Sequence, residues 1–536
     1  MDISRRAGRF AWIGAAFVLV AFVGRSWAQT TPAAPAKLSE DRADALARIK
    51  PDSMRGHLSF LASDLLEGRD TPSRGLDIAA EYIAAQFRRA GLEPIGDSGY
   101  FQTAKWRVVR PVESGSRFAI EIAGTTTPLE VDRLTLPNSK PTALALEKIG
   151  LIKADPEKLD ALTKAYVEGR ALLVDLPDPA AAPPAERAAA FMKRNRMLTR
   201  IQELAAALVV SRDRVSPRGR GFGPPALLGP ADAPNRSTVP SRIRGGAGGP
   251  TVLTVHDPEA IARLDALEAG TPASVTAVCA APREEIVELR NVAGLLRGSD
   301  PALADTYVLV TAHYDHVGIG PGVKGDRIYN GANDDGSGTV TVVELASALG
   351  ALRDRPKRSI LFLTFFGEEK GLLGSRYYGS HPLVPIDKTV ADINLEQVGR
   401  TDSTEGPQVA RASMTGIDYS DVGAVFIREG AAEGVAVVKH PTNSDRYFGA
   451  SDNQALADLG VPAHTLCVAF QYDDYHGPLD HWEKIDYVNM AKIARVTARA
   501  LLAIADDPAE PKWNADNPRA KRYKEALERR KAAPAK

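Results

Sequence analysis

The stretch from Tyr307 to His316 reads YVLVTAHYDH and joins an apolar run to a polar cluster. Its first residues are β-branched or large and apolar, which is typical of a strand that is buried on both faces. The run from Ser359 to Phe366 has the same character, and the residues between the two, at 339–349, have helical periodicity. Strands that alternate with helices from residue 291 onward predict an α/β domain with a mostly parallel mixed sheet and helices on both faces.

Composition limits the classes of function. The 536 residues carry 67 basic and 67 acidic side chains, so the net charge gives no overall attraction to nucleic acid or to an anionic membrane. The length predicts several domains, at roughly 100–200 residues each. Two cysteines, Cys279 and Cys467, cannot build a disulfide framework or a structural zinc knuckle, and the sequence leaves open whether they pair. Any metal must therefore be held by histidine and carboxylate.

Residues 1–28 are predicted to be a signal peptide. Arginines at positions 5, 6 and 9 precede the apolar stretch Ala11–Val23, and Ser26-Trp27-Ala28 provides a small-x-small cleavage site. The apolar stretch is shorter than the roughly 20 residues that span a bilayer. We therefore expect an exported protein, periplasmic or extracellular, with no stable membrane insertion after cleavage. The choice between the general and the twin-arginine export route stays open.

Seven of the nine histidines fall between residues 313 and 481. In that region polar clusters follow apolar strands, and in a strand residues i and i+2 point to the same face. His313 and Asp315 can therefore point together, with the carboxylate orienting the imidazole. Adjacent carboxylates at a buried strand end, Glu368 and Glu369, repel each other unless a cation is present. Each cluster alone could be an ordinary turn, but open α/β sheets bind ligands at the carboxyl ends of their strands. Together the clusters predict one functional site.

The motifs resemble the di-zinc metallopeptidase family that includes bacterial leucyl aminopeptidases and glutamate carboxypeptidases. Five segments carry the resemblance in family order: AHYDH, NGANDDGSG, FFGEEKGLLGS, INLEQVGR and YHGPLD-HWEKID. With the region around HLSFLASDLLEGRDTPSRG, the resemblance covers about residues 50–110 and 285–505. The block between them is similar to the β-rich protease-associated domain that is often inserted in this family, by its position and by GRALLV at 169–174.

The expected organisation follows from this resemblance. The N-terminal part of the peptidase domain would cover 29–115, the inserted domain 116–284, the catalytic domain 285–505 and a charged tail 506–536. Within the insertion, the Gly/Pro/Arg-rich stretch from Ser216 to Pro250 is typical of a long loop. The basic run from Arg519 to Lys531 is expected to be a solvated helix or tail rather than a nucleic-acid-binding arm.

Carried over position by position, the resemblance implies a centre for two Zn²⁺ ions with five protein ligands. His313 and Glu396 would bind one ion, Glu369 and His476 the other, and Asp334 both. Glu368 would be the general base, Tyr475 a hydroxyl near the oxyanion, and Asp315 the support of His313. Two positions depart from the family. Glu396 replaces the usual aspartate. Asn453 replaces a frequent histidine, and this second change suggests altered substrate contacts.

The resemblance implies a secreted two-zinc exopeptidase that acts on peptides. Among the activities of the family, it favours an aminopeptidase. Two divalent ions roughly 3.5–4 Å apart can share a water and polarise the scissile carbonyl. The alternatives are a glutamate carboxypeptidase-type hydrolase, a single-zinc glutaminyl cyclase and a non-catalytic binding scaffold. A carboxypeptidase of this type needs arginines for substrate carboxylates, and the catalytic region offers Arg327, Arg376, Arg400 and Arg446. The sequence does not indicate the role of the inserted domain or the oligomeric state.

Overall fold

The structure is a computed structural model. It describes residues 37–110, 112, 114–129, 131–135, 143–177, 187–212, 226–232, 250–255, 257–268, 270–281, 283–323 and 325–532. The predicted signal peptide, residues 1–28, lies outside the described residues. Within the described ranges, no helix has both the length and the apolar character needed to cross a membrane.

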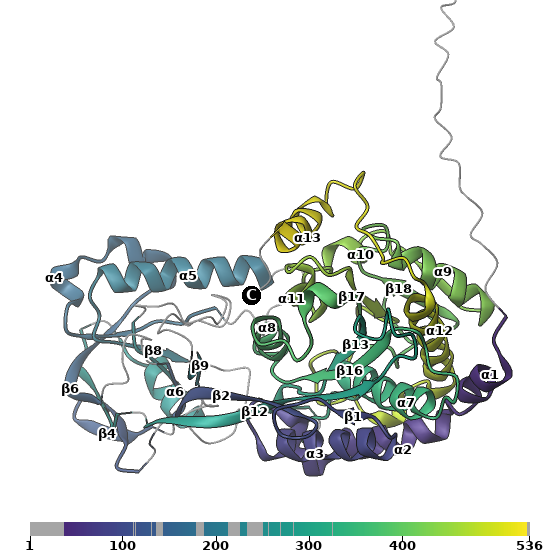
Figure 1. Cartoon of the computed structure of the whole chain (residues 1–536). Helices are drawn as coiled ribbons and strands as arrows, with labels where there is room; N and C mark the ends of the chain where they lie inside the picture. Colours follow the sequence, from purple (N-terminus) through teal and green to yellow (C-terminus); the bar gives the residue numbers. More distant parts are fainter. Residues whose placement is uncertain are drawn as a thin grey trace, which may run out of the picture. The chain divides into compact units, whose positions relative to one another are not determined.

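A ten-stranded mixed sheet organises the larger part of the chain, in the order β19-β18-β20-β17-β13-β16-β12-β2-β9, with β1 paired to β12 (Figure 1). Strands β16, β13, β17 and β20 are parallel neighbours, whereas β12 and β18 join them antiparallel. The predicted mixed sheet is confirmed, and its parallel strands are concentrated at the centre. The strands are β1 Glu93–Pro94, β2 Phe101–Arg110, β9 Ala226–Pro230, β12 Arg283–Leu296, β13 Tyr307–His313, β16 Ser359–Phe365, β17 Thr389–Glu396, β18 Arg411–Met414, β19 Ala436–Val438 and β20 Ala463–Cys467.

Helices cover both faces of this sheet because its central strands are apolar on both sides. Val308 and Val310 of β13 lie in one hydrophobic core, and their neighbours Tyr307 and Leu309 lie in another, as strand alternation requires. Helices of the first core are α1 Glu40–Ala47, α2 Pro51–Leu61, α3 Arg74–Arg89, α7 Gly338–Gly350, α9 Val422–Ala432 and α12 Tyr487–Asp506. Helices that contribute to the second core are α8 Leu373–Ser380, α11 Asn453–Ala457 and α13 Lys521–Ala532. The predicted flanking of the sheet on both faces is confirmed.

The middle of the chain forms a second sheet of eight strands, in the order β4-β3-β11-β6-β7-β8-β10-β5. These are β3 Arg117–Ile122, β4 Thr125–Pro128, β5 Val131–Thr135, β6 Leu144–Lys153, β7 Ala171–Leu173, β8 Leu208–Arg212, β10 Val252–Val255 and β11 Ala273–Cys279. The same block contains helices η2 Pro156–Ala161, α4 Lys164–Val167, α5 Arg187–Glu203 and α6 Pro258–Asp265. The block is therefore a mixture of strands and helices, and its relation to a protease-associated domain stays a prediction.

Two expectations about loops and tails need correction. Within the loop expected at 216–250, residues 226–230 form β9, which pairs with β2 at the end of the ten-stranded sheet; an edge strand tolerates proline because one side of it needs no partner. The basic run at 519–531 largely forms the expected helix, α13, but it is not fully solvated, because Tyr523 is buried with its ring stacked on that of Trp513, 5.1 Å away. These aromatic residues hold the C-terminal segment against the sheet domain, although most of the residues in that segment are charged or polar. Cys279 and Cys467 are each buried and unpaired.

Candidate metal centre

The carboxyl ends of β13, β16 and β17 bring imidazole and carboxylate groups into one space. His313 ends β13, Glu396 ends β17, and Glu368 follows β16. Parallel neighbours end at the same edge of a sheet, so these side chains meet. His313 Nε2 lies 3.5 Å from Glu396 Oε1 and 4.0 Å from Glu368 Oε2.

Asp334 connects this group to a second one. It lies in the irregular turn η3 Ala332–Ser337, directly before α7, where its backbone leaves the helical conformation. Asp334 Oδ1 lies 3.4 Å from His313 Nε2, and Asp334 Oδ2 lies 3.0 Å from His476 Nε2. The turn is held by Asp480, whose carboxylate accepts the backbone N–H groups of Asn333 and Asp334 at 2.9 and 3.2 Å. The two oxygens of Asp334 therefore face two different histidines.

The second group contains a residue that the sequence analysis did not select as a ligand. His476 Nε2 lies 3.1 Å from Glu369 Oε1, as expected for two ligands of one ion. His316 Nδ1 lies 2.9 Å from the same oxygen, and its side chain is fully buried. The signal in the sequence was the second histidine of AHYDH, but it lies beyond the strand, where alternation no longer predicts direction.

The side chains form two sets that can hold a metal ion. One set is His313, Asp334 and Glu396, and the other is His316, Asp334, Glu369 and His476; in each, the candidate atoms lie within 4.8 Å of one another. Several of these atoms are buried and find no hydrogen-bond partner in the described part of the chain: His313 Nε2, His316 Nδ1, Asp334 Oδ2 and Glu369 Oε1. Unpartnered buried polar atoms are costly, and imidazole with carboxylate is a ligand set that suits zinc. The residues therefore fit zinc.

The electrostatics of the centre reflect a concentration of negative charge. Burial lowers the pKa of His313, but Glu396 and Glu368 outweigh that effect and hold the pKa well above its usual value. The pKa of His476 is likewise raised, because Glu369 and Asp334 outweigh burial. Burial raises the pKa of Glu368 well above its usual range; the charge of His313 opposes this effect, and the charges of Glu396 and Glu369 add to it. A bound cation would reverse this balance by favouring ionised carboxylates and neutral imidazoles.

Asp315 positions two of the residues at the centre, His313 and Glu368. Its Oδ1 lies 3.5 Å from His313 Nδ1 and accepts the backbone N–H of Glu368 at 3.0 Å. Its Oδ2 accepts a hydrogen bond from Thr71 Oγ1 at 3.3 Å. His313 Nδ1 also lies 3.2 Å from the main-chain carbonyl oxygen of Asp315. Asp315 thus fixes both the imidazole of His313 and the beginning of the loop that carries Glu368.

Tyr475 lies beside the second group. Its ring stacks on His476 with centroids 4.1 Å apart. Burial of the phenol, together with the charges of Asp334 and Glu369, raises the pKa of Tyr475 well above its usual value. The hydroxyl therefore keeps its proton at neutral pH and can donate a hydrogen bond.

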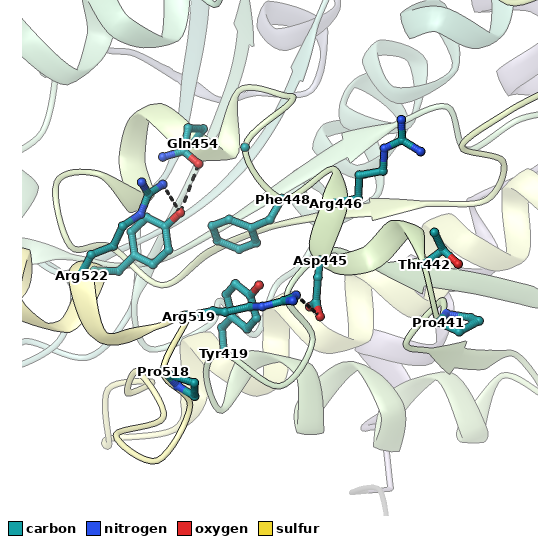
Figure 2. Close-up of a pocket in the computed structure, with 12 residues that line it drawn as sticks. Tyr419, Pro441, Thr442, Asp445, Arg446, Phe448, Gln454, Pro518, Arg519 and Arg522 are labelled. Atoms are coloured by element: carbon teal, nitrogen blue, oxygen red, sulfur yellow. Dashed lines mark hydrogen bonds and ion pairs between the residues drawn. The ribbon is translucent and has the colours of Figure 1, made fainter. Parts of the chain in front are cut away.

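Three residues considered for substrate binding, Arg400, Arg446 and Asn453, lie where their contact with a substrate at the centre is restricted. Arg400 is buried and forms ion pairs with Asp402 at 2.6 Å and Asp474 at 3.0 Å. Arg446 lines a surface pocket together with Arg519 and its ion-pair partner Asp445, a pocket that none of the candidate ligands lines (Figure 2). The expectation that Asn453 changes substrate contacts is not supported. Asn453 is fully buried, donates to the Phe448 carbonyl at 3.0 Å and accepts from Thr465 Oγ1 at 2.9 Å.

The model of peptidase family M28 matches residues 291–501, which include every candidate ligand. Over these residues the chain is similar to peptidase family M28. The relatives of the M28 segment include aminopeptidase YwaD of Bacillus subtilis (strain 168), 25% identical over 42% of this chain and 46% of that protein. A probable zinc metalloprotease of Pyrenophora teres f. teres is 35% identical over 42% of this chain and 50% of that protein. The chain thus spans about half the length of these curated relatives.

Solved structures share the fold well beyond the M28 segment. A zinc aminopeptidase from Bacillus subtilis superposes with a TM-score of 0.55 at 17% identity and covers 86% of this chain and 97% of its own. An aminopeptidase from Aneurinibacillus sp. strain AM-1 gives a TM-score of 0.52 at 19% identity and covers 88% and 97%. At these identities the likeness establishes the fold.

Proposed function

We propose that the chain is an exported two-zinc aminopeptidase that hydrolyses peptide bonds. The observation that carries the proposal is the shared position of Asp334 between two ligand sets, with Glu368 close to His313 but in neither set. A carboxylate near the ions that does not bind them is free to carry a proton. The similarity to aminopeptidase YwaD and to a probable zinc metalloprotease supports this activity.

In this proposal His313 and Glu396 would hold one ion, Glu369 and His476 would hold the other, and Asp334 would contribute to both. Bound zinc would supply Lewis acidity, which lowers the pKa of water and polarises the scissile carbonyl. Glu368 accepts the proton of the attacking water and delivers it to the departing amine. The hydroxyl of Tyr475 donates to the oxyanion that develops on the carbonyl. Asp315 keeps His313 and the Glu368 loop in register.

Two of the four arginines considered for a substrate carboxylate, Arg400 and Arg446, give little support to a glutamate carboxypeptidase, and the similarity to aminopeptidase YwaD favours an aminopeptidase. Recognition of a substrate carboxylate needs a guanidinium with unused donors. The guanidinium of Arg400 is already engaged by Asp402 and Asp474, and Arg446 lines a pocket with no candidate ligand. A non-catalytic scaffold predicts lost ligands, whereas all five ligand positions carry a histidine or a carboxylate. The same complete set disfavours a single-zinc cyclase, although related cyclases keep much of it.

The test is a metal analysis of the purified chain together with a panel of matched substrates. We expect about two zinc ions per chain and cleavage of aminoacyl-nitroanilides. The same nitroanilides with an acetylated α-amino group, and N-acyl-glutamates, should remain uncleaved. Cleavage of N-acyl-glutamates alone would contradict the aminopeptidase assignment, and one zinc without hydrolysis would contradict the two-ion centre. Export predicts that protein recovered outside the cytoplasm of a bacterial host begins at Gln29.

A further inference from the structure

We propose that His316 is a fourth protein ligand at the ion position formed by Asp334, Glu369 and His476. This inference rests on the proposed zinc centre and adds a residue to it. Zinc ligands at bond lengths of about 2.0–2.1 Å in a tetrahedron lie about 3.3 Å from one another. The contacts within this set have similar lengths: 2.9 Å for His316 Nδ1 to Glu369 Oε1, 3.1 Å for His476 Nε2 to the same oxygen, and 3.0 Å for His476 Nε2 to Asp334 Oδ2.

The contact between His316 and Glu369 does not have the direction of a hydrogen bond. His316 Nδ1 and Glu369 Oε1 are close, yet both count among the buried atoms with no hydrogen-bond partner in the described ranges. A contact of 2.9 Å that leaves both atoms without a hydrogen bond leaves both available to a third partner. A cation between them would satisfy both.

Burial makes an unpartnered His316 expensive. The side chain has no exposed surface, and within the described ranges Nε2 also lacks a hydrogen-bond partner. A neutral imidazole in such a position loses its hydrogen bonds to water without replacement. Ligation of an ion through Nδ1 would offset part of that loss. An apolar residue of similar size would fill the same space without this cost.

The surrounding backbone fixes the imidazole in this position. The backbone N–H of His316 donates to the carbonyl of Arg69 at 3.2 Å. Gly331 has a φ of +57°, and a Cβ there would lie 2.4 Å from Cγ of the His316 ring. The ring also meets His476 edge to face, with centroids 5.5 Å apart. The glycine thus leaves room for the ring, and the position of His316 is set by packing rather than by flexibility.

The two ion positions would then differ in their protein ligands. The position with His316 has four, and the position with His313, Asp334 and Glu396 has three. A position with fewer protein ligands keeps coordination sites for water and substrate. Glu368, 4.0 Å from His313, lies next to this more open position. We therefore expect the four-ligand position to bind zinc more tightly and the three-ligand position to exchange it more readily.

The experiment is a zinc titration of the metal-depleted full chain against a chromophoric chelator. Wild type should bind two ions with unequal affinities. His316→Ala should weaken the tighter ion by at least tenfold, the scale expected for a lost ligand, and leave the weaker ion within about twofold. His316→Asn places an amide nitrogen near the position of Nδ1, where it could donate a hydrogen bond to Glu369 but would be a poor zinc ligand. This variant should behave like the alanine variant. The unchanged weaker ion shows that each variant is folded.

A second readout counts the ligands. X-ray absorption of the chain loaded with one equivalent of zinc should indicate two imidazoles in wild type and one in His316→Ala. Wild-type affinity in His316→Ala would overturn the inference. Wild-type affinity in His316→Asn would also overturn it, because His316 would then be a hydrogen-bonding support of Glu369. If wild type binds a single ion that His316→Ala loses, the ligand assignment stands and the two-ion function fails.

Discussion

The hydroxyl of Ser451 donates a hydrogen bond of 2.7 Å to Oε2 of Glu396, the carboxylate at the end of β17. Ser451 is in turn held by the side-chain amide of Asn394, which donates to the serine oxygen at 2.8 Å. Glu396 is one methylene longer than the aspartate usual in the family, so its carboxylate has an additional rotatable bond. The hydrogen bond from Ser451 restricts that freedom and aims the other oxygen, Oε1, toward His313 at 3.5 Å.

Replacement of Ser451 by alanine should therefore weaken metal binding. Partners that orient a ligand typically contribute 10–100-fold to metal affinity, and we expect a loss in that range for the ion at His313 and Glu396. Competition titration with a chelator measures the effect. Ser380→Ala, on the end of α8, is the matched control and should bind as wild type. Unchanged affinity in Ser451→Ala would show that the hydrogen bond does not orient Glu396.

The variant Glu368→Gln should lose hydrolysis and keep its metal. The amide cannot accept the proton of the attacking water, and general-base groups contribute about 10²–10⁴-fold to rate. Turnover of an aminoacyl-nitroanilide and zinc content are measured on the same preparation. Glu284→Gln, at an exposed position of β12, controls for the loss of one carboxylate. Near-normal turnover in Glu368→Gln would remove this residue from the mechanism.

Asp392 should make the stability of the metal-depleted protein depend on pH. Burial, which is complete, raises the pKa of Asp392 to about 8. The folded chain therefore keeps a proton that the unfolded chain releases near pH 4. The contribution of Asp392 to the free energy of unfolding is fully present below about pH 4 and is lost as pH rises through about 8. Between the two values the free energy of unfolding falls by roughly 1.4 kcal/mol per pH unit.

The variant Asp392→Asn removes this titration. Its free energy of unfolding in urea should fall less than that of wild type between pH 5.5 and 7.5, by about 2–3 kcal/mol. Metal-depleted protein is used because zinc binding has a pH dependence of its own. Asp516→Asn, at an exposed position, should retain the wild-type slope. Equal slopes in wild type and Asp392→Asn would mean that Asp392 does not carry a raised pKa.

Arg69 should be essential to the stability of the centre although it binds no ion. It is buried, and its guanidinium donates to the carbonyls of Tyr314 at 2.8 Å, Asn330 at 2.7 Å and Gly331 at 3.0 Å. These carbonyls belong to the segments that carry the AHYDH and NGANDDGSG motifs. Arg69→Met leaves them without donors, and each unsatisfied buried group costs about 1–3 kcal/mol.

We therefore expect Arg69→Met to lower the free energy of unfolding by roughly 3 kcal/mol or more and to weaken both zinc ions. Urea unfolding and chelator titration measure the two effects. Arg48→Met, at an exposed position after α1, serves as the control and should change neither. Full zinc affinity in a destabilised Arg69→Met would limit the role of Arg69 to folding.

Much of the fold and of the candidate centre is determined locally by the sequence. The apolar runs at 307–313, 359–365 and 389–396 form strands because every position in them is compatible with burial on a sheet. Parallel neighbours bring their carboxyl ends to one edge, so the residues that directly follow or end these strands converge. The grouping of His313, Glu369 and Glu396 with Asp334 is therefore a consequence of strand pattern and motif order.

The tertiary structure determines the positions of side chains outside the strands, which strand periodicity cannot predict. His316 lies in an irregular segment after β13, where its direction depends on the space that Gly331 leaves and on the carbonyl of Arg69. The guanidinium of Arg400 is engaged by Asp402 and Asp474. Asp402 is its near neighbour in the sequence, whereas Asp474 is brought to it only by the tertiary fold. Contacts between residues far apart in the chain depend on packing, and packing is settled only when the whole sheet and its helices are assembled.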